Sequence, residues 1–302
     1  MLVRSRAAGI CGSEVEGYLG RMSNRVPPLV MGHEFAGTVT EVGAGVDTTW
    51  VGKPVAINPI VGCGSCLFCM RGDRNLCPDR YLLGVAVPGG FATVVAVAER
   101  CLFEMPAAMD MRLGALVEPL ANGVHAFRSG APDGVANAVV IGAGTIGLAC
   151  MQATLLHGAM SVDVVELHPA RRDHALRLGA RVAYASGSEV KPGVDLVIDA
   201  VGTNATRLLA VQLLNPAGTA VFIGLHEDET ALPWHRIVRG NHTIKGVFGY
   251  SDSDFEQALE WLASGRAGIG TMADVLPLAE GPAAFASLAK GPVDDIKVFL
   301  GA

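Results

Sequence analysis

The chain has 302 residues, of which 50% are hydrophobic and 17% charged, so it can bury the cores of about two domains at ~150 residues each. Its 29 acidic residues outnumber the 23 basic ones, giving a net charge of −6 and a pI near 5.7. Because proteins that bind nucleic acids normally carry a basic surplus, this balance argues against DNA or RNA as a partner.

The first 130 residues contain short β-rich runs separated by glycine and proline: EFAGTVTEVG, KPVAINPI and GGFATVVAV. The N-terminal segment MLVRSRAAGICGSE has no apolar core and no cleavage site, so we expect no export signal and a cytoplasmic location. Thiols stay reduced in that compartment, which disfavours disulfides among the seven cysteines. These features predict a β-rich domain over residues 1–130.

Within this domain four cysteines follow the spacing C-x2-C-x2-C-x7-C: Cys63, Cys66, Cys69 and Cys77. Four thiolates match the closed tetrahedral shell of a structural zinc ion, with Zn–S bonds of ~2.3 Å. An iron–sulfur cluster also uses four thiolates, so the spacing alone leaves it open. A nucleic-acid-binding zinc ribbon is disfavoured by the acidic net charge.

From residue 131 to residue 250 the pattern alternates between strands and helices. Strands are predicted at ANAVVIGAG, SVDVVEL, VDLVIDAVG, TAVFIGL and TIKGVFGY, and helices at TIGLACMQATLLHG, PARRDHALRLGA and ATRLLAVQLLNPAG. This alternation predicts an α/β domain with a doubly wound parallel sheet. The tail, residues 251–302, begins with a predicted helix, DSDFEQALEWLASGR, and ends in DIKVFLGA, a strand that could rejoin the first domain.

Residues 137–162 carry no Asp, Glu, Lys or Arg, a length that could suggest a membrane span. The run VVIGAGTIG in its middle is a poor continuous helix, because it combines β-branched residues with three spaced glycines. We therefore expect a buried strand followed by a buried helix, and no membrane association.

A G-x-G-x-x-G motif lies between the first predicted strand and helix of this domain, and we expect its turn to bind a dinucleotide pyrophosphate. The residues of the turn are Gly142, Gly144, Thr145, Ile146 and Gly147. Glu166 follows at the end of the next strand, where an acid can hold both ribose hydroxyls and favours NAD over NADP. Arg171 and Arg172, close behind, weaken that preference.

A second set of potential ligands consists of Cys11, His33, Glu34 and Glu118. A thiolate, an imidazole and a carboxylate, with room for water, make an open catalytic zinc shell. The four residues are far apart in sequence, so their spacing does not join them. Taken singly, each also has a structural interpretation, such as a packed cysteine or a hydrogen-bonded core histidine.

Six segments, in family order along nearly the whole chain, resemble the zinc-dependent medium-chain dehydrogenase/reductase family of alcohol, sorbitol and threonine dehydrogenases. They are GICGSE (9–14), GHEFAGTVTEVG (32–43), the four-cysteine segment, EPLANGVHA (118–126), VIGAGTIG (140–147) and IKGVFG (244–249). The resemblance implies a GroES-like catalytic domain over 1–130, a Rossmann domain over 131–250, and a segment, 251–302, that rejoins the catalytic domain.

The same resemblance implies roles for individual residues. Cys11, His33 and Glu34 would be ligands of a catalytic zinc, and Glu118 would bind that ion directly or through water. Ser13 would relay the alcohol proton, and the four cysteines would hold a second zinc. The implied activity is hydride transfer between a secondary alcohol (a polyol, sugar alcohol or hydroxy amino acid) and NAD, or less readily NADP, in a homo-dimer or homo-tetramer.

Two departures from the family pattern stand out. Only ten residues precede Cys11, so about two strands of ~5 residues each are expected to be absent. Glu16 stands where many relatives carry a histidine that completes the proton relay. The short N-terminus motivates an alternative function, an inactive relative that binds a dinucleotide as a sensor or structural partner.

Overall fold

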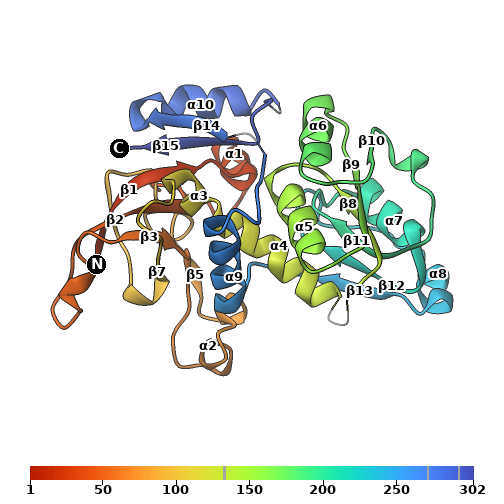
Figure 1. Ribbon diagram of the computed structural model, residues 1–302, viewed down its shortest axis with the longest axis horizontal. Coiled ribbons are helices and arrows are strands. Elements are labelled where there is room, and N and C mark those ends of the chain that lie inside the picture. The colour runs from red at the N-terminus through yellow and green to blue at the C-terminus, as the bar shows by residue number, and fades with distance from the viewer. Residues whose placement is uncertain (132–133, 271, 292) are drawn as a thin grey trace. The chain divides into compact units, whose positions relative to one another are not determined.

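The computed structural model describes residues 1–131, 134–270, 272–291 and 293–302 (Figure 1). The chain forms two compact units. The first comprises Met1–Glu118, Tyr250–Gly265 and Thr271–Ala302, and the second comprises Pro119–Gly249 and Arg266–Gly270. The C-terminal part of the chain therefore belongs mainly to the same unit as the N-terminal part.

The first unit is built on a seven-stranded sheet with the order β14-β15-β1-β2-β3-β7, in which β6 also pairs with β1. Its strands are β1 (Leu2–Gly9), β2 (Glu34–Glu41), β3 (Pro54–Ile57), β6 (Val94–Ala96), β7 (Leu102–Glu104), β14 (Met272–Pro277) and β15 (Lys297–Gly301). A separate two-stranded ribbon joins β4 (Ile60–Val61) and β5 (Tyr81–Leu82). Strand β1 pairs antiparallel with both β2 and β15, so three distant segments meet there.

Helices and short 3-10 turns complete the first unit. The helices are α1 (Gly12–Tyr18), α2 (Leu67–Met70), α3 (Met111–Ala115), α9 (Asp252–Ala263) and α10 (Gly281–Leu288), and the 3-10 turns are η1 (Thr48–Trp50), η2 (Arg74–Leu76), η3 (Glu99–Cys101) and η5 (Leu278–Glu280). The unit boundary falls inside α4 (Val117–Gly130).

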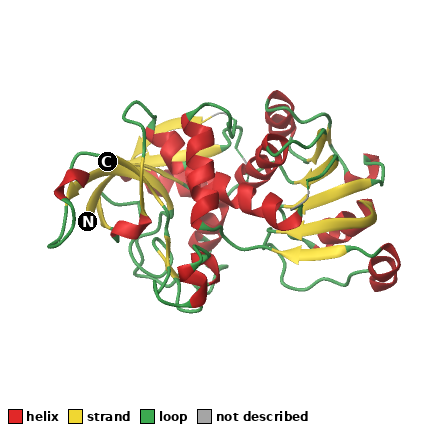
Figure 2. Ribbon diagram, turned by 60° about the horizontal axis from the view of Figure 1, so that its bottom comes forward, coloured by secondary structure: helices red, strands yellow, loops and turns green. Residues whose placement is uncertain are grey.

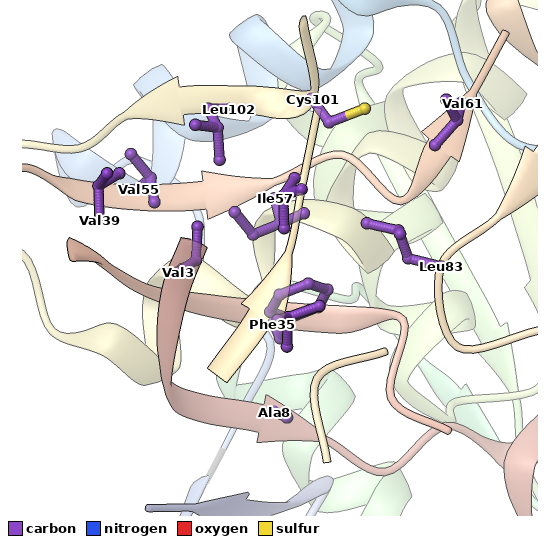
Figure 3. Close-up of a cluster of buried hydrophobic side chains, with 12 residues drawn as sticks. Val3, Ala8, Phe35, Val39, Val55, Ile57, Val61, Leu83, Cys101 and Leu102 are labelled. Atoms are coloured by element: carbon purple, nitrogen blue, oxygen red, sulfur yellow. The ribbon is translucent and has the colours of Figure 1, made fainter. Parts of the chain in front are cut away.

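The sheet of the first unit encloses an apolar core (Figure 3). Side chains at alternate positions of a strand point to opposite faces. In β1, accordingly, Val3 and Ser5 are buried while Arg4 and Arg6 are exposed. Phe35 from β2 lies in the middle of the cluster among side chains from the neighbouring strands.

The second unit contains a six-stranded parallel sheet with the order β10-β9-β8-β11-β12-β13. Figure 2 draws its strands in yellow and the helices in red. Its strands are β8 (Asn137–Ile141), β9 (Ser161–Val165), β10 (Ala183–Tyr184), β11 (Val194–Asp199), β12 (Leu214–Phe222) and β13 (Thr243–Gly246), and its remaining elements are α5 (Thr145–Leu156), α6 (Pro169–Arg177), η4 (Gly187–Glu189), α7 (Asn204–Leu213) and α8 (Trp234–Gly240). This strand order, which reverses between β8 and β11, is that of a dinucleotide-binding Rossmann fold. The predicted α/β fold class is confirmed.

Several elements differ from the sequence-based expectation. The helix predicted to run through residue 218 ends at Leu213, because Pro216 cannot continue a helix and the chain turns directly into β12. The elements that were not predicted are the helices α1, α2, α3, α4, α8 and α10 and the strands β1, β5, β7, β10 and β14. Among the described residues, no helix has both the length and the apolar character needed to cross a bilayer, and the uncharged run is divided between β8, a turn, α5 and the start of β9.

Candidate active site and metal centres

Three of the four predicted catalytic-zinc residues lie together in the first unit. The ligand atoms of Cys11, His33 and Glu34 are all within 4.8 Å of one another. The pairing of β1 with β2 explains this, since Gly9 at the end of β1 is in register with Glu34 at the start of β2. Cys11 follows Gly9 by two residues and is therefore carried next to His33 and Glu34.

The carboxylate of Glu14, which sequence reasoning did not single out, holds this group in place. It is completely buried, and its Oε2 accepts a hydrogen bond from the backbone N–H of Cys11 (3.0 Å). Its Oε1 accepts from the backbone N–H of His33 (3.1 Å) and lies 2.9 Å from His33 Nδ1. The sequence signal that could have identified Glu14 is an acidic residue in the first turn of a helix. When Nδ1–H donates to Glu14, the opposite ring nitrogen, Nε2, is left to bind a metal.

The electrostatics of Glu14 and His33 fit the same interpretation. Burial raises the pKa of Glu14, but the His33 ring and the Cys11 backbone outweigh burial and hold that pKa below its usual value. Burial lowers the pKa of His33, whereas the Glu14 carboxylate and the neighbouring Cys11 side chain raise it well above normal. A metal ion must therefore displace a proton from His33 when it binds.

Lys297, from the far end of the chain, pairs with Glu34. Its Nζ lies 2.5 Å from Glu34 Oε2 and donates a second hydrogen bond to the carbonyl of Ile10 (3.2 Å). Burial lowers the pKa of Lys297, but the neighbouring Glu34 carboxylate raises it above its usual value, so the pair is ionic. The other oxygen, Oε1, is buried and has no hydrogen-bond partner in the described part of the chain. A buried carboxylate oxygen without a donor, beside a thiol and an imidazole, fits a zinc ligand.

Glu118, the fourth predicted ligand, is buried in the first turn of α4 but lies outside this group. Its carboxylate is close to the hydroxyl of Tyr250, which is itself buried and makes no hydrogen bond of regular geometry within the described residues. Burial, followed by the charge of Glu118, raises the pKa of Tyr250 well above its usual value. Contact of Glu118 with the same ion would need a bridging water or a rotation of the side chain.

The two residues considered for proton relay have different surroundings. Ser13 lies half-buried in the first turn of α1, and its Oγ accepts a hydrogen bond from Nη2 of Arg25 (3.0 Å). Glu16 instead pairs at the surface with Arg21, whose Nη1 is 3.3 Å from Glu16 Oε1, and the two side chains are 35% and 62% exposed. Glu16 is therefore a solvated carboxylate.

Residues 63–77, here called the lobe, carry a second group of potential ligands. All four of its sulfur atoms lie within 4.8 Å of one another: Cys63, Cys66, Cys69 and Cys77. A single ion with Zn–S bonds of ~2.3 Å needs tetrahedral S–S distances of about 3.8 Å. The sulfurs of Cys63 and Cys69 are 3.9 Å apart. An iron–sulfur cluster would place several irons between its thiolates and hold them further apart, so the geometry favours one zinc ion.

Backbone contacts support this thiolate group. The N–H groups of Ser65 and Cys66 lower the pKa of Cys63 to about 6, whereas burial raises the pKa of Cys69 to about 12. Gly62 is required by close packing, because a Cβ at this position would lie 2.6 Å from the sulfur of Cys69. The backbone N–H of Asp252, in α9, donates to the carbonyl of Gly72 (3.0 Å) and anchors the lobe to the C-terminal segment.

In the second unit, the glycine motif forms the turn between β8 and α5. Gly142 has a φ of +91°, in the left-handed region that favours glycine. A Cβ on Gly147 would lie 1.8 Å from the carbonyl oxygen of Gly142, so only glycine fits there. A Cβ on Gly144 would have only Arg171 Nη1 within 4 Å, at 3.8 Å. Thr145 and Ile146 begin α5, and the open side at Gly144 leaves the helix start accessible to a pyrophosphate.

Glu166 is positioned at this turn by hydrogen bonds from the backbone. Its Oε2 accepts from the N–H of Ala143 (2.7 Å) and its Oε1 from the N–H of His168 (2.8 Å). Arg172 donates to the carbonyls of Glu166 and Leu167, so that guanidinium braces the chain locally. The Nε of Arg171 is buried without a hydrogen-bond partner among the described residues, and its Nη1 faces Gly144. An anion at the turn would satisfy it.

Comparisons with known proteins give a consistent result. Residues 1–107 match the alcohol dehydrogenase GroES-like domain, and residues 145–264 match the zinc-binding dehydrogenase family. A probable D-xylulose reductase A from Arthroderma otae is 34% identical over 88% of this chain and 80% of its own length. The sorbitol dehydrogenase of Bacillus subtilis is 31% identical, over 88% and 79%. A putative zinc-binding dehydrogenase from Sinorhizobium meliloti, solved with NADP, aligns with a TM-score of 0.91 at 27% identity and covers 100% of this chain and 92% of its own.

Proposed function

Because the chain belongs to the zinc-dependent medium-chain dehydrogenase/reductase family, whose members transfer a hydride between an alcohol and NAD(P), we propose that its substrate is a polyol or sugar alcohol, oxidised at a secondary hydroxyl. The names of two relatives, a D-xylulose reductase and a sorbitol dehydrogenase, support this substrate class. None of these relatives supports the alternative of an inactive sensor.

The observation that carries the proposal is the convergence of Cys11, His33 and Glu34 within 4.8 Å. These three side chains would hold a zinc ion, with Glu118 reaching it through water. Zinc bound there supplies Lewis acidity, which lowers the pKa of a coordinated hydroxyl. Glu14 keeps His33 in the tautomer that presents Nε2 to the metal, and Lys297 holds one oxygen of Glu34 while leaving the other to bind.

Ser13 would take the proton of the substrate hydroxyl onto Oγ while its own proton passes to water. The serine is unchanged at the end of the step, and the alcohol is ready to lose its hydride to the nicotinamide. Positioned proton transfer of this kind typically contributes about 10²- to 10⁴-fold to the rate. A Ser13→Ala variant should therefore retain the fold and the zinc but lose most of its turnover.

We propose NAD as the preferred cofactor, bound at the turn formed by Gly142, Gly144 and Gly147. Glu166 supports this preference, because both of its oxygens are fixed at the turn, where a 2′-phosphate would meet a negative charge. Arg171 would contact the pyrophosphate, since its Nη1 faces Gly144. If Arg171 instead binds a 2′-phosphate, the chain will use NADP at least as well as NAD.

We also propose two zinc ions per chain, one at each group of ligands, and a cytoplasmic location. All seven cysteines are free thiols in the structure, which suits a reducing compartment. A homo-dimer or homo-tetramer is proposed from the family resemblance. It is supported by the strongly exposed side chains of Trp234 (65%) and Val238 (75%) on α8. Light scattering of the purified protein would test the assembly.

The function is tested with purified protein, elemental analysis and a panel of polyols. Elemental analysis should find about two zinc ions per chain. The absorbance at 340 nm should increase when sorbitol, xylitol or 2,3-butanediol is added with NAD. The matched control is Cys11→Ser, which should lose one zinc and all turnover. Absence of activity with every alcohol, using zinc-loaded protein and both cofactors, would disprove the proposed function.

A further inference from the structure

Arg25, in the loop between α1 and β2, is a buried cation beside the proposed active site. Only 9% of its surface is exposed. Its Nη1 donates to the carbonyl of Gly84 (2.7 Å), and its Nη2 donates to Oγ of Ser13 (3.0 Å). Its Nε is buried without a hydrogen-bond partner in the described residues. Burying a charge that is only partly paired is costly, so a structural role alone accounts poorly for this arginine.

Two neighbouring side chains, Glu14 and Ser13, could explain why a charged residue is buried at position 25. Glu14 is one, because Arg25 helps to lower its pKa, although the contribution is smaller than those of His33 and Cys11. No hydrogen bond joins Arg25 to Glu14 within the described part of the chain. The directed contact from the guanidinium to a side chain goes to Ser13, the hydroxyl assigned to proton relay.

The hydrogen-bonding capacity of Ser13 gives this contact a consequence. A hydroxyl has one proton to donate and two lone pairs that accept, whereas arginine donates only and stays charged. Nη2 therefore occupies one lone pair of Oγ and can never take the serine proton. The second lone pair is left for the substrate hydroxyl, and the proton of Ser13 must point towards another acceptor, such as water.

We propose that Arg25 is a positioning residue for the proton relay. It fixes Ser13 as the acceptor of the substrate proton and stabilises negative charge on Oγ while the serine proton leaves. The bond between the substrate oxygen and its proton breaks, a new Oγ–H bond forms, the old Oγ–H proton passes to water, and the guanidinium is unchanged. This inference rests on the proposed function, since it requires an alcohol substrate at Ser13.

The test is a double-mutant cycle with Arg25→Met, Ser13→Ala and the combined variant, assayed with the polyol that the wild type oxidises. We expect Arg25→Met alone to lower kcat about 10- to 100-fold, as for loss of a hydrogen bond from a charged group, with KM for NAD unchanged. In the Ser13→Ala background the same substitution should change kcat less than about twofold, because Arg25 acts through Ser13.

Other outcomes of this cycle would overturn the inference. Additive losses would show that Arg25 acts independently of Ser13. A rise in KM for the polyol at unchanged kcat would make Arg25 a substrate-binding residue instead. Arg25→Lys keeps the positive charge but lacks the planar guanidinium, so it should retain part of the kcat that Arg25→Met loses. If Arg25→Met does not fold, the lysine variant is used in its place in the cycle. The matched control is Arg21→Met, at an arginine in the same loop that is 62% exposed, with kcat expected within about twofold of wild type.

A measurement without turnover separates this inference from the proposed function. Thermal unfolding of the same four proteins should show coupled, non-additive losses for Arg25 and Ser13, since each loses the other's hydrogen bond. If the wild type oxidises no alcohol, the proposed function fails while the unfolding cycle still reports on the pair. If the effects of the Arg25 and Ser13 substitutions on thermal unfolding are additive, the hydrogen bond between the two side chains does not contribute to stability and the inference fails.

Discussion

Replacing Lys297 by methionine should destabilise the first unit strongly, because it leaves the Glu34 charge buried and unpaired. The two side chains are 2% and 0% exposed, and methionine keeps most of the volume of lysine. Removing one partner of a buried ion pair costs about 3–5 kcal/mol. The surface pair of Lys53 and Glu104, 33% and 51% exposed at 2.7 Å, provides the matched control. Its substitution Lys53→Met should cost about 0–1 kcal/mol.

Urea unfolding of chelator-treated protein, followed by tryptophan fluorescence, measures this difference. Trp50 and Trp261 belong to the first unit and Trp234 to the second, so a Trp234→Phe background reports on the first unit alone. Adding Glu34→Gln to Lys297→Met should restore most of the stability, since no buried charge is then left unpaired. If Lys297→Met costs no more than Lys53→Met, the ion pair is not buried as described.

Three further changes follow from the site geometry. Gly62→Ala should lower the zinc content of the lobe without unfolding the chain, because its Cβ would lie 2.6 Å from the sulfur of Cys69; Gly43→Ala, where a Cβ meets nothing within 4 Å, is the control for elemental analysis. In metal-free protein, iodoacetamide labelling of Cys63 should rise with pH around a midpoint near 6, as the thiol becomes a thiolate, while Cys69, with a pKa of about 12, stays unlabelled in peptide mass spectra; equal labelling at pH 7 would contradict this. Glu166→Ala should raise KM for NAD, because a backbone N–H of the glycine turn loses its acceptor, and should narrow the preference for NAD over NADP, because a 2′-phosphate would no longer meet a negative charge; an unchanged ratio of the kcat/KM values for the two cofactors would rule out this role.

The features that could be predicted from the sequence are those determined by short-range patterns. Spacing alone identified the four-cysteine lobe, because its ligands lie within fifteen residues of one another. The turn at Gly142 was predictable, since a strand, spaced glycines and a helix follow directly in sequence. The alternation of strands and helices also gave the parallel sheet of the second unit.

The remaining features depend on pairing between distant strands. Lys297 is 263 residues from Glu34, and only the β15-β1-β2 arrangement brings the two together. Arg25 lies in a loop without regular structure, so no periodicity marks it as a partner of Ser13. The position of Glu118 outside the group of Cys11, His33 and Glu34 could not be anticipated either, because it depends on where α4 packs and not on a local sequence pattern.

The central place of β1 has a consequence for how the protein matures during synthesis. The four lobe cysteines lie within fifteen residues, so they are synthesised in quick succession and can bind an ion during translation. The catalytic ligands also emerge early, but the lysine that neutralises Glu34 lies in β15, 263 residues further along the chain. A nascent chain therefore carries an uncompensated carboxylate at Glu34 until β15 has been synthesised and has paired with β1, and the group of ligands has its full set of neighbours only then.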